Sequence, residues 1–416
     1  MEPREEKGLR IAAISRLTRS GDAWLVPSQA TDKKYRVDPK GGTCSCPDFE
    51  SRNKTCKHLY AVQFVIQREQ SVTETIDGAV TTTTVTEKLT VTKRVTYKQD
   101  WPAYNAAQTH EKERFLALLH ELCAGIEEPI QTFGRPRLSF ADMIFCTSFK
   151  IYSTVSGRRF MSDLREAHAK GYVAKLPHYN SIFRYLESGA LTGYLKDLIA
   201  RSSLPLKAVE TDFAIDSSGF STNQFCRWFD TKYGEDKQKR EWIKLHLMCG
   251  VRTNVVTSVE VSKQYANDSP FFKSLVDKTS KSGFTLAEIS ADKAYLSADN
   301  LRVALSKGAQ PYIPFKSNSV ATSGYNPKST LWTRMFHYYN LNREDFLTHY
   351  HKRSNAETTF SMIKMKFGER LRSKTETAQI NEALCKVLCH NLCCVIQSIF
   401  EMKIEPTFWA ETAVAS

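Results

Sequence analysis

Residues 209–217 read Val-Glu-Thr-Asp-Phe-Ala-Ile-Asp-Ser, and the fold follows from this stretch. Apolar side chains fall on one face of an extended chain, and the carboxylates of Glu210, Asp212 and Asp216 fall on the other. This alternation predicts a β-strand. Two more β-rich runs, 242–251 and 254–261, are separated by a short turn. Together the three runs predict a meander of antiparallel strands.

Downstream of the meander, helical and extended patterns alternate. We expect a helix over 269–281, a strand over 284–290 that leads into Ala291-Asp292-Lys293, a helix over 298–307 and a strand over 311–315. Such alternation is typical of parallel strands joined by helices. The prediction for 205–400 is therefore an α/β domain with a mixed sheet flanked by helices.

Four polar residues near the C-terminus have a spacing that suggests phosphodiester chemistry. Tyr350, Arg353, Glu357 and Lys364 stand at offsets that fall within an arc of about 60° on a single helix, at about 100° per residue. An apolar stripe runs along the other side, from 356 to 367. A carboxylate between two cations suits a site that holds a metal ion and grips phosphate oxygens. A solvated charged face is the alternative.

Three carboxylates on different elements can converge on one site. Asp216 lies in the first strand, Asp292 closes a neighbouring parallel strand, and Glu357 lies on a later helix. Such a set can hold a pair of Mg²⁺ ions about 3.5 to 4 Å apart, which activate the attacking oxygen and stabilise the leaving oxygen of a phosphoryl displacement. Asp212, on the same strand face, is the alternative to Asp216.

The composition favours a polyanionic partner. The chain has 416 residues, 58 Lys and Arg against 45 Asp and Glu, a formal net charge of +13 and a pI near 9.1. Nucleic acid is the first candidate. We identify no apolar stretch of 18 residues and no N-terminal signal sequence, so neither a membrane partner nor secretion is expected. The 11 cysteines of such a chain indicate thiols and metal ligands rather than disulfides.

Four zinc-type ligands lie close together near the N-terminus. Cys44, Cys46, Cys56 and His58 form a C-x-C pattern followed by C-x-H, and this set closes a tetrahedral site without a position for water. The prediction is a structural Zn²⁺ site. Two short strands upstream, around 24–26 and 35–37, and a helix over 57–67 complete a unit that is too small to fold without its metal.

A second group of cysteines and histidine, further along the chain, is interpreted as core. Its cysteines recur every four residues among Leu and Val, which is the pattern of a buried helix that uses Cys as a small hydrophobe. The group comprises Cys385, Cys389, His390, Cys393 and Cys394.

Residues 108–204 predict a helical DNA-binding domain, with helices over 111–125, 139–153, 159–170, 181–188 and 191–200. The sequence Gly134-Arg-Pro-Arg137 precedes the second of them. Because Gly-Arg-Pro can lie in an A·T-rich minor groove, Arg135 and Arg137 are candidate DNA contacts, although a turn before a helix is the alternative. The run 181–186 could also be the second helix of a helix-turn-helix, with Arg184 and Tyr185 facing DNA.

The N-terminal motif resembles the SWIM zinc finger, a small β-β-α module associated with DNA binding and with protein contacts. The similarity extends from Trp24-Leu-Val-Pro-Ser through Cys44-Ser-Cys46-Pro-Asp-Phe to Cys56-Lys-His58. The resemblance supports the prediction of bound Zn²⁺, but the ligands do not indicate whether this module binds DNA or protein.

Asp216, Asp292 and Glu357 resemble the DDE triad of insertion-sequence transposases, which have a ribonuclease H-like fold. The Tyr350, Arg353, Glu357, Lys364 spacing resembles the signature of their Y-R-E-K branch. The sequence similarity extends from Trp101-Pro-Ala-Tyr through Ala214-Ile-Asp-Ser-Ser-Gly-Phe, Lys244-Leu-His246 and Ala291-Asp-Lys-Ala-Tyr295 to His390-Asn391.

This resemblance implies a DNA transposase of a bacterial or archaeal insertion sequence. Such an enzyme uses Mg²⁺ or Mn²⁺ to hydrolyse DNA at transposon ends and then directs the freed 3′ hydroxyl into target DNA. Arg353 and Lys364 would hold backbone phosphates, Lys366 would be a further DNA contact, and Tyr350 would help to stabilise the strand end. We expect a cytoplasmic, nucleoid-associated protein that is at least a dimer when bound to DNA.

The predicted order of domains is a zinc module at 1–70, a Thr-rich linker at 71–107, the helical domain at 108–204, the ribonuclease H-like catalytic domain at 205–400 and a tail at 401–416. The interval between Asp292 and Glu357 leaves little room for the large β-rich insertion that some relatives use at a hairpin end. Trp332, within it, could stack on an extruded base or belong to the core. A transposon-derived DNA-binding protein without catalysis and a nuclease without strand transfer are the alternative functions.

Overall fold

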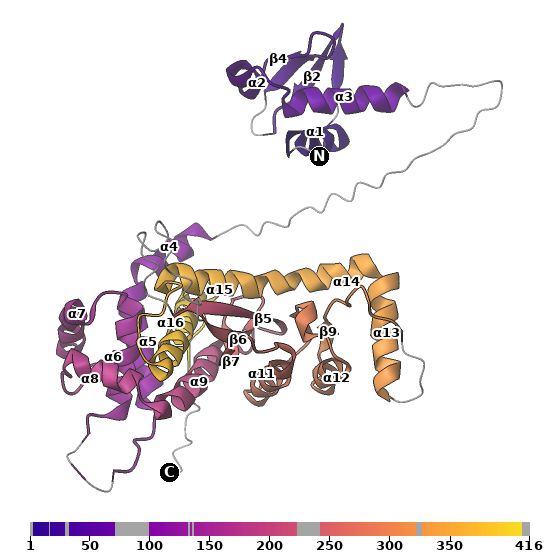
Figure 1. Cartoon of the computed structure of the whole chain (residues 1–416). Helices are drawn as coiled ribbons and strands as arrows, with labels where there is room; N and C mark the ends of the chain where they lie inside the picture. Colours follow the sequence, from indigo (N-terminus) through magenta and orange to yellow (C-terminus); the bar gives the residue numbers. More distant parts are fainter. Residues whose placement is uncertain are drawn as a thin grey trace, which may run out of the picture. The chain divides into compact units, whose positions relative to one another are not determined.

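The computed structural model describes residues 3–15, 17–29, 33–70, 100–131, 134, 137–222, 242–321 and 327–409. The chain divides into two compact units, 1–97 and 98–416 (Figure 1). Residues 71–99 of the predicted linker lie outside the described residues. The end of that segment forms helix α4, Trp101–Thr109, whose first turn is capped by the Asp100 side chain.

The first unit is a small antiparallel sheet packed against helices. Its described elements are α1 Pro3–Ile14, β1 Thr18–Ser20, β2 Ala23–Pro27, β3 Lys34–Asp38, β4 Thr43–Cys44, α2 Pro47–Arg52 and α3 Lys57–Gln70, with the strands in sequential order. The two predicted strands and the helix are confirmed as β2, β3 and α3. Helix α1 was not predicted. It packs so closely on α3 that a side chain at Gly8 would meet Tyr60.

The second unit is built on a mixed sheet, which has five strands among the described residues. They are β5 Asp212–Ser221, β6 Trp242–Gly250, β7 Val256–Lys263, β8 Glu288–Ala291 and β9 Gln310–Tyr312, in the order β7-β6-β5-β8-β9. Strands β5, β6 and β7 pair antiparallel, which confirms the predicted meander, and β8 pairs parallel with both β5 and β9. This arrangement fits the ribonuclease H-like fold that the resemblance implies.

Helices pack on both faces of this sheet because β5 is apolar on both sides. Ala214 belongs to one core, which also contains residues of α9 Gly189–Ser203, α15 Ser354–Phe367 and α16 Glu376–Met402. Phe213 and Ile215 belong to the other core, with α11 Ser269–Lys281 and α12 Ala298–Ser306. Helix α13 Pro327–Leu341 extends this second core and is followed by α14 Arg343–Tyr350. The predicted helices at 269–281 and 298–307 are therefore confirmed.

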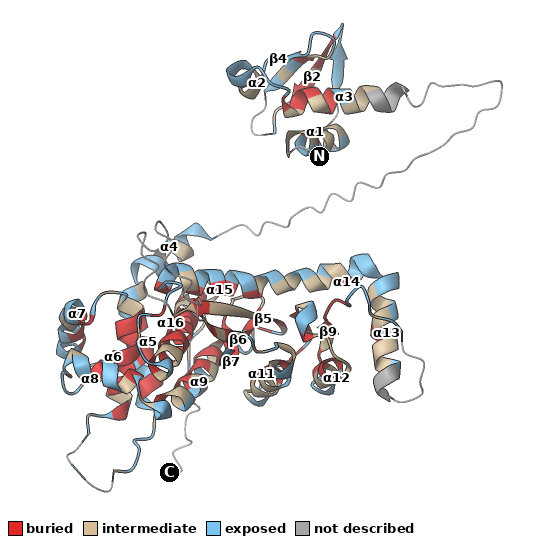
Figure 2. Cartoon of the chain, in the orientation of Figure 1, coloured by how far each residue is buried: buried red, intermediate tan, exposed pale blue. Residues whose placement is uncertain are grey.

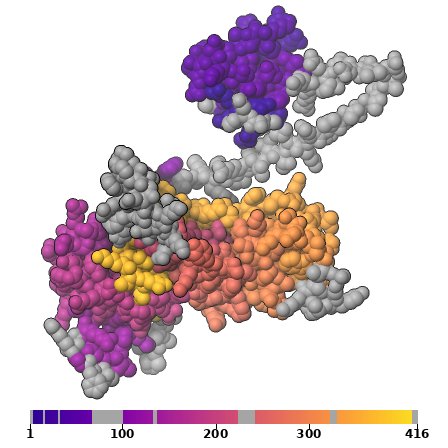
Figure 3. Space-filling model, in the orientation of Figure 1, coloured from indigo at the N-terminus to yellow at the C-terminus, as the bar shows by residue number. Residues whose placement is uncertain are grey.

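The helices that precede the sheet share its first core. The elements α5 Glu111–Ala124, α6 Phe140–Ser153, α7 Gly157–Ala169, α8 Tyr179–Leu186 and α9 match the predicted helices to within a few residues. Their apolar faces meet those of α15 and α16 in one continuous cluster (Figure 2), and the space-filling view shows them in continuous contact with the sheet region (Figure 3). The boundary predicted between 204 and 205 does not coincide with a break in packing.

Helix α16 lies at the centre of this core. The buried side chains of Cys385, Cys389 and Cys394 are part of it, which confirms their interpretation as core residues. Contrary to the sequence analysis, α16 is long and apolar enough to cross a membrane, but most of that stretch is buried inside the protein. The Asn391 amide joins α16 to the sheet, because it donates to the Val256 carbonyl at 2.7 Å and accepts from the Val256 N–H at 2.8 Å.

Candidate functional site

The register of two parallel strands places Asp216 beside Asp292. Ile215 of β5 pairs with Ala291 of β8, and each aspartate is the next residue along its strand direction. Because neighbouring strands lie about 4.8 Å apart, the two aspartate backbones are close neighbours. Asp292 ends the strand and opens a 3-10 turn, η2 Lys293–Tyr295, where its Oδ1 accepts the Ala294 N–H at 2.9 Å.

Arg353 connects Glu357 to this pair. Its Nη1 donates to Asp216 Oδ2 at 2.7 Å, and its Nη2 donates to Glu357 Oε1 at 2.5 Å. Glu357 lies in the first turn of α15, where its side chain is 58% exposed, whereas that of Asp216 is only 17% exposed. The structure therefore brings together all three carboxylates of the predicted triad.

The site carries an excess of negative charge that a cation would relieve. Burial raises the pKa of Asp216, and the nearby charges of Asp292 and Glu357 raise it further, against the Ser217 N–H and Arg353, which lower it. Carboxylate oxygens are the ligands that Mg²⁺ and Mn²⁺ prefer. The chemistry of these side chains thus suits a divalent cation of this kind, although among the described residues they are not grouped as closely as the ligands of a formed metal site.

The predicted single helix of the Tyr350 motif is interrupted. Tyr350 ends α14, a 3-10 turn η3 at His351–Arg353 follows, and α15 begins at Ser354. The interruption leaves Tyr350 next to the site, since the Arg353 guanidinium lies 5.9 Å from the centre of the Tyr350 ring. Burial raises the pKa of the Tyr350 phenol, and the charge of Asp292 also contributes. The phenol is therefore a proton-bearing group at the edge of the carboxylates.

The predicted DNA-contacting lysines have different surroundings. Lys364 Nζ lies 5.4 Å from the ring of Phe220 on β5 and 3.7 Å from a carboxylate oxygen of Glu369. Lys366 instead pairs with Glu111 of α5, and its Nζ also lies 3.3 Å from Cys393 Sγ. The structure does not bring Lys366 to the carboxylates.

Asp212 differs from Asp216 in its partners. Its Oδ2 accepts from Lys352 Nζ at 2.7 Å, and the same amine lies 2.7 Å from Glu288 Oε2. His349 Nδ1 lies 2.9 Å from the Glu288 carboxylate, which completes a cluster of paired charges. The sequence analysis missed this cluster, although Lys352 stands directly before Arg353. Asp212 is thereby engaged away from Asp292 and Glu357.

A second polar group that the sequence analysis missed lies behind Asp216. Ser217 donates its backbone N–H to Asp216 Oδ1 at 2.8 Å and its hydroxyl to Asp268 Oδ2 at 3.2 Å. Asp268 in turn pairs with Lys244, and its Oδ1 lies 3.6 Å from His246 Nδ1. Lys244 and His246 belong to the stretch that carried the resemblance, which was the available signal for them.

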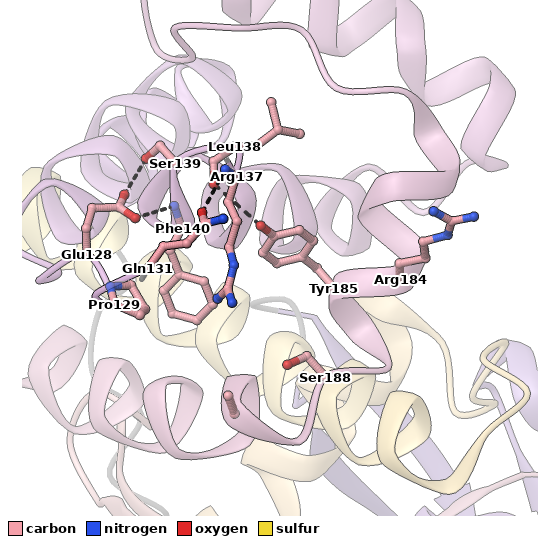
Figure 4. Close-up of a pocket in the computed structure, with 11 residues that line it drawn as sticks. Glu128, Pro129, Gln131, Arg137, Leu138, Ser139, Phe140, Arg184, Tyr185 and Ser188 are labelled. Carbon is pink, nitrogen blue, oxygen red and sulfur yellow. Dashed lines mark hydrogen bonds between the residues drawn. The ribbon is translucent and has the colours of Figure 1, made fainter. Parts of the chain in front are cut away.

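The candidate arginines of the helical segment are only partly described. Arg135 lies outside the described residues. Arg137 lines a cavity of about 840 Å³ together with Arg184 and Tyr185, whose hydroxyl donates to the Leu138 carbonyl at 3.5 Å (Figure 4). Arg137 and Arg184 thus line one cavity beside the N-terminus of α6, although the Arg184 guanidinium points away from Arg137 (Figure 4), and no residue of the carboxylate group lines it.

Between β9 and α15 the described helices are α13 and α14, and no strand follows β9 in the described part of this interval. Trp332 packs edge-on against Phe315 with ring centres 4.8 Å apart, and its Nε1 donates to the Val320 carbonyl at 2.9 Å. Of the two interpretations of Trp332, packing against the core describes its position in this structure.

The predicted zinc ligands form a second site, in the first unit. Cys44 ends β4, Cys46 precedes α2, and Cys56 and His58 flank the start of α3. All four are buried, and their ligand atoms lie within 4.8 Å of one another. His58 Nδ1 is 3.9 Å from the sulfurs of both Cys44 and Cys56.

This geometry fits a tetrahedral Zn²⁺ site. Ligand atoms at about 2.0 to 2.3 Å from a central zinc would be separated by distances similar to those observed. Hydrogen bonding from Cys44 lowers the pKa of Cys56, which favours the thiolate form that a metal ion binds. Among the described residues, this is the group of Cys, His and acidic side chains that is arranged to hold a metal ion.

Comparison with known families agrees with both sites. Residues 207–392 match the family model described as Transposase DDE domain, and residues 35–63 match the SWIM zinc finger. No solved structure matches the chain at a significant level. The first match contains Asp216, Asp292 and Glu357, and the second contains all four zinc-type ligands. The chain thus contains a transposase DDE domain, and it carries a SWIM zinc finger near its N-terminus.

Proposed function

We propose that the protein is a DNA transposase of a bacterial or archaeal insertion sequence. It hydrolyses DNA at the transposon ends and then transfers the freed 3′ hydroxyl into target DNA. The observation that carries this proposal is the convergence of Asp216 and Asp292, next to each other in register, with Glu357, which Arg353 holds in place. We also propose the Y-R-E-K branch, because Tyr350, Arg353 and Glu357 remain together despite the interrupted helix.

In this proposal the three carboxylates hold two Mg²⁺ ions, or Mn²⁺. When bound, the ions would polarise the scissile phosphate and lower the pKa of the attacking water or hydroxyl. Arg353 exchanges at least one of its carboxylate partners for a backbone phosphate when DNA enters, since a guanidinium binds both groups with the same fork of N–H donors. Lys364, at the far end of the same helix face, holds a second phosphate.

The residues around Asp216 keep its carboxylate in one orientation. The Ser217 N–H fixes Asp216 Oδ1 and leaves Oδ2 toward Arg353 and the other carboxylates. The Tyr350 phenol, which stays protonated because burial raises its pKa, can donate a hydrogen bond to the DNA end. These residues therefore position the ligands and the strand end without taking part in bond breaking.

DNA is the proposed partner, at the transposon ends and at the target. The net charge of +13 favours it. Because one transfer reaction joins two transposon ends, we propose at least a homodimer on DNA, in the cytoplasm near the nucleoid. The SWIM zinc finger would contact DNA or the second subunit.

A cleavage assay on a labelled transposon end with Mg²⁺ or Mn²⁺ tests the proposal. Asp216→Asn, Asp292→Asn and Glu357→Gln should each lower the nicking rate by roughly three orders of magnitude or more, because a metal ligand supplies several kcal/mol to the transition state. Asp212→Asn is the matched control, since its side chain lies on the same strand but pairs with Lys352. It should retain nicking within about tenfold.

The same assay separates the alternatives. Nicking that survives in any of the three variants would exclude the assigned triad. Nicking by the unmodified protein without joining to target DNA would indicate a nuclease, and DNA binding without nicking would indicate a protein that has lost catalysis.

A further inference from the structure

A cavity of about 450 Å³ lies between α6, α8, the start of α7 and the segment that leads into α16. Pockets of this size are typical of sites for small molecules and nucleotides. One part of its wall is apolar and includes Val155, Phe183 and Leu186, and another part carries the cations of Lys150, Arg372 and Lys374. The cavity is therefore suited to a ligand that has an apolar body and a negative charge.

Lys150 is the unusual residue of this wall. It is only 6% exposed, yet its ammonium group has no hydrogen bond or ion pair within the described part of the chain. Burial lowers the pKa of Lys150, and the nearby Arg372 lowers it further, while the charge of Glu382 offsets part of this shift. A largely buried ammonium group that makes no hydrogen bond is costly, so its position at a cavity points to a ligand that would complete it.

The acidic residues of the cavity compensate Lys150 only in part, because none of them forms a hydrogen bond or ion pair with it. Glu382 accepts the backbone N–H groups of Arg372 and Ser373 at 2.9 and 2.8 Å, and it lies 3.5 Å from Lys386 Nζ. Its charge is thus already compensated by other donors. Glu187 is exposed at the rim. The interior of the cavity consequently keeps a positive potential.

The N-terminus of α7 supplies a further feature of an anion site. Ser156 and Gly157 line the cavity at the start of this helix, and the Ser156 side chain does not cap it. The first N–H groups of a helix have no partner within the helix and favour an anion at that end. A side chain at Gly157 would come within 2.7 Å of the Phe183 ring, so glycine lets the ring stand against the helix start.

We propose that this cavity binds a phosphate group of a nucleotide, with Lys150 as its central cation. Arg372, Lys374 and the start of α7 surround the phosphate, and the wall formed by Val155, Phe183 and Leu186 contacts the sugar or base. The phosphate belongs either to a DNA strand or to a free nucleotide, because both present the same oxyanion. This site is separate from the carboxylates and goes beyond the transposase proposal.

The test compares Lys150→Met with Lys170→Met in the full chain. Both variants remove one positive charge, but Lys170 is exposed at the opposite end of α7, where it pairs with Glu166. Binding of a labelled single-stranded oligonucleotide is measured by anisotropy without divalent metal, so that cleavage cannot interfere. Binding of inorganic phosphate and of a deoxynucleoside monophosphate is measured by thermal shift.

Lys150→Met should weaken binding about tenfold or more, as expected for a lost charge-assisted hydrogen bond, and Lys170→Met about twofold or less. Weaker binding of all three probes by Lys150→Met assigns the site to free nucleotides. Weaker binding of the oligonucleotide alone assigns it to a DNA phosphate. Equal binding by both variants would overturn the proposal. If Lys150→Met does not fold, Lys374→Met replaces it, and binding equal to that of Lys170→Met would then be the refuting result. Failure of the nicking assay leaves this measurement unaffected.

Discussion

Glu260 on β7 links the edge of the sheet to a helix on each face. Its replacement by glutamine should lower the free energy of unfolding by a predictable amount. Its Oε2 accepts from Lys196 of α9 at 2.7 Å, and its Oε1 accepts from Lys278 and Ser274 of α11, both at 2.5 Å. The Glu260 side chain is 13% exposed. One carboxylate thus holds both helices at the strand that closes this side of the sheet.

The size of the effect follows from the pKa of Glu260. Burial raises it, but the hydrogen bonds from Lys196, Lys278 and Ser274 outweigh this and lower it from 4.5 to about 2. A difference of that size corresponds to about 3 kcal/mol at neutral pH. Since Lys278 is 42% exposed and its pairing is screened by water, we expect a loss of about 2 to 3 kcal/mol for Glu260→Gln.

The sign of the pH dependence provides a second check. A carboxylate whose pKa is lowered in the folded state contributes its full stability above its unfolded pKa, and this contribution is lost as the pH falls toward the folded pKa. The free energies of unfolding of the two proteins should therefore differ most at pH 7 and converge between about pH 4.5 and pH 2.

Urea unfolding at a series of pH values measures this difference. Glu405→Gln, which changes an exposed glutamate near the C-terminus, is the control and should stay within about 0.5 kcal/mol of the unmodified protein. A difference for Glu260→Gln that is below about 0.5 kcal/mol at pH 7, or that persists unchanged at pH 3, would refute the assigned role.

Two other predictions concern the metal and the central helix. Chelation, or Cys56→Ser, should make residues 3–70 sensitive to protease, because a structural zinc supplies about 10 kcal/mol to such a unit. The melting temperature of the second unit should stay unchanged. A first unit that stays protease-resistant without metal would contradict this prediction. Asn391→Ala should lower the free energy of unfolding of the second unit by about 3 kcal/mol in urea, since it leaves buried hydrogen-bonding groups without a partner. The exposed control Asn340→Ala should lower it by less than about 0.5 kcal/mol.

The strands and two of the carboxylates could be predicted because their signals are local. Alternation around Asp216 shows that β5 has two faces, and an apolar run that ends on Asp292 indicates a strand end. The parallel order of the strands then sets the two residues side by side. Glu357 could be predicted as a third member from its spacing to Arg353, because residues four apart on a helix lie on the same face.

Other features depend on contacts that a local pattern does not contain. Lys366 was expected to contact DNA, but its partner in the structure is Glu111, which lies in a distant part of the sequence. The turn between Tyr350 and Ser354 has no breaking residue such as Pro or Gly, so nothing in the sequence marks the change from one helix to the next. Gly8 was the available signal for α1, since glycine in a helical pattern often marks the close approach of another backbone.

The apolar faces of helices α5 to α9 likewise do not indicate which helix they pack against. Phe149 of α6 and Leu195 of α9 show only that each helix has a buried side. They pack in the same core as α16, and this could not be read from their periodicity. A boundary drawn at the change from helical to extended pattern therefore separates residues that the fold keeps together.

The position of α16 also bears on the order in which the protein can form during synthesis. The ribosome releases α5 to α9 first, and the helix that fills their core begins only at Glu376. At about 5 to 20 residues per second, the early helices wait roughly 10 to 40 seconds with their apolar faces uncovered. The first unit has its own sheet and ligands and needs no such delay. The nascent chain can thus complete its N-terminal module well before it completes the group of three carboxylates.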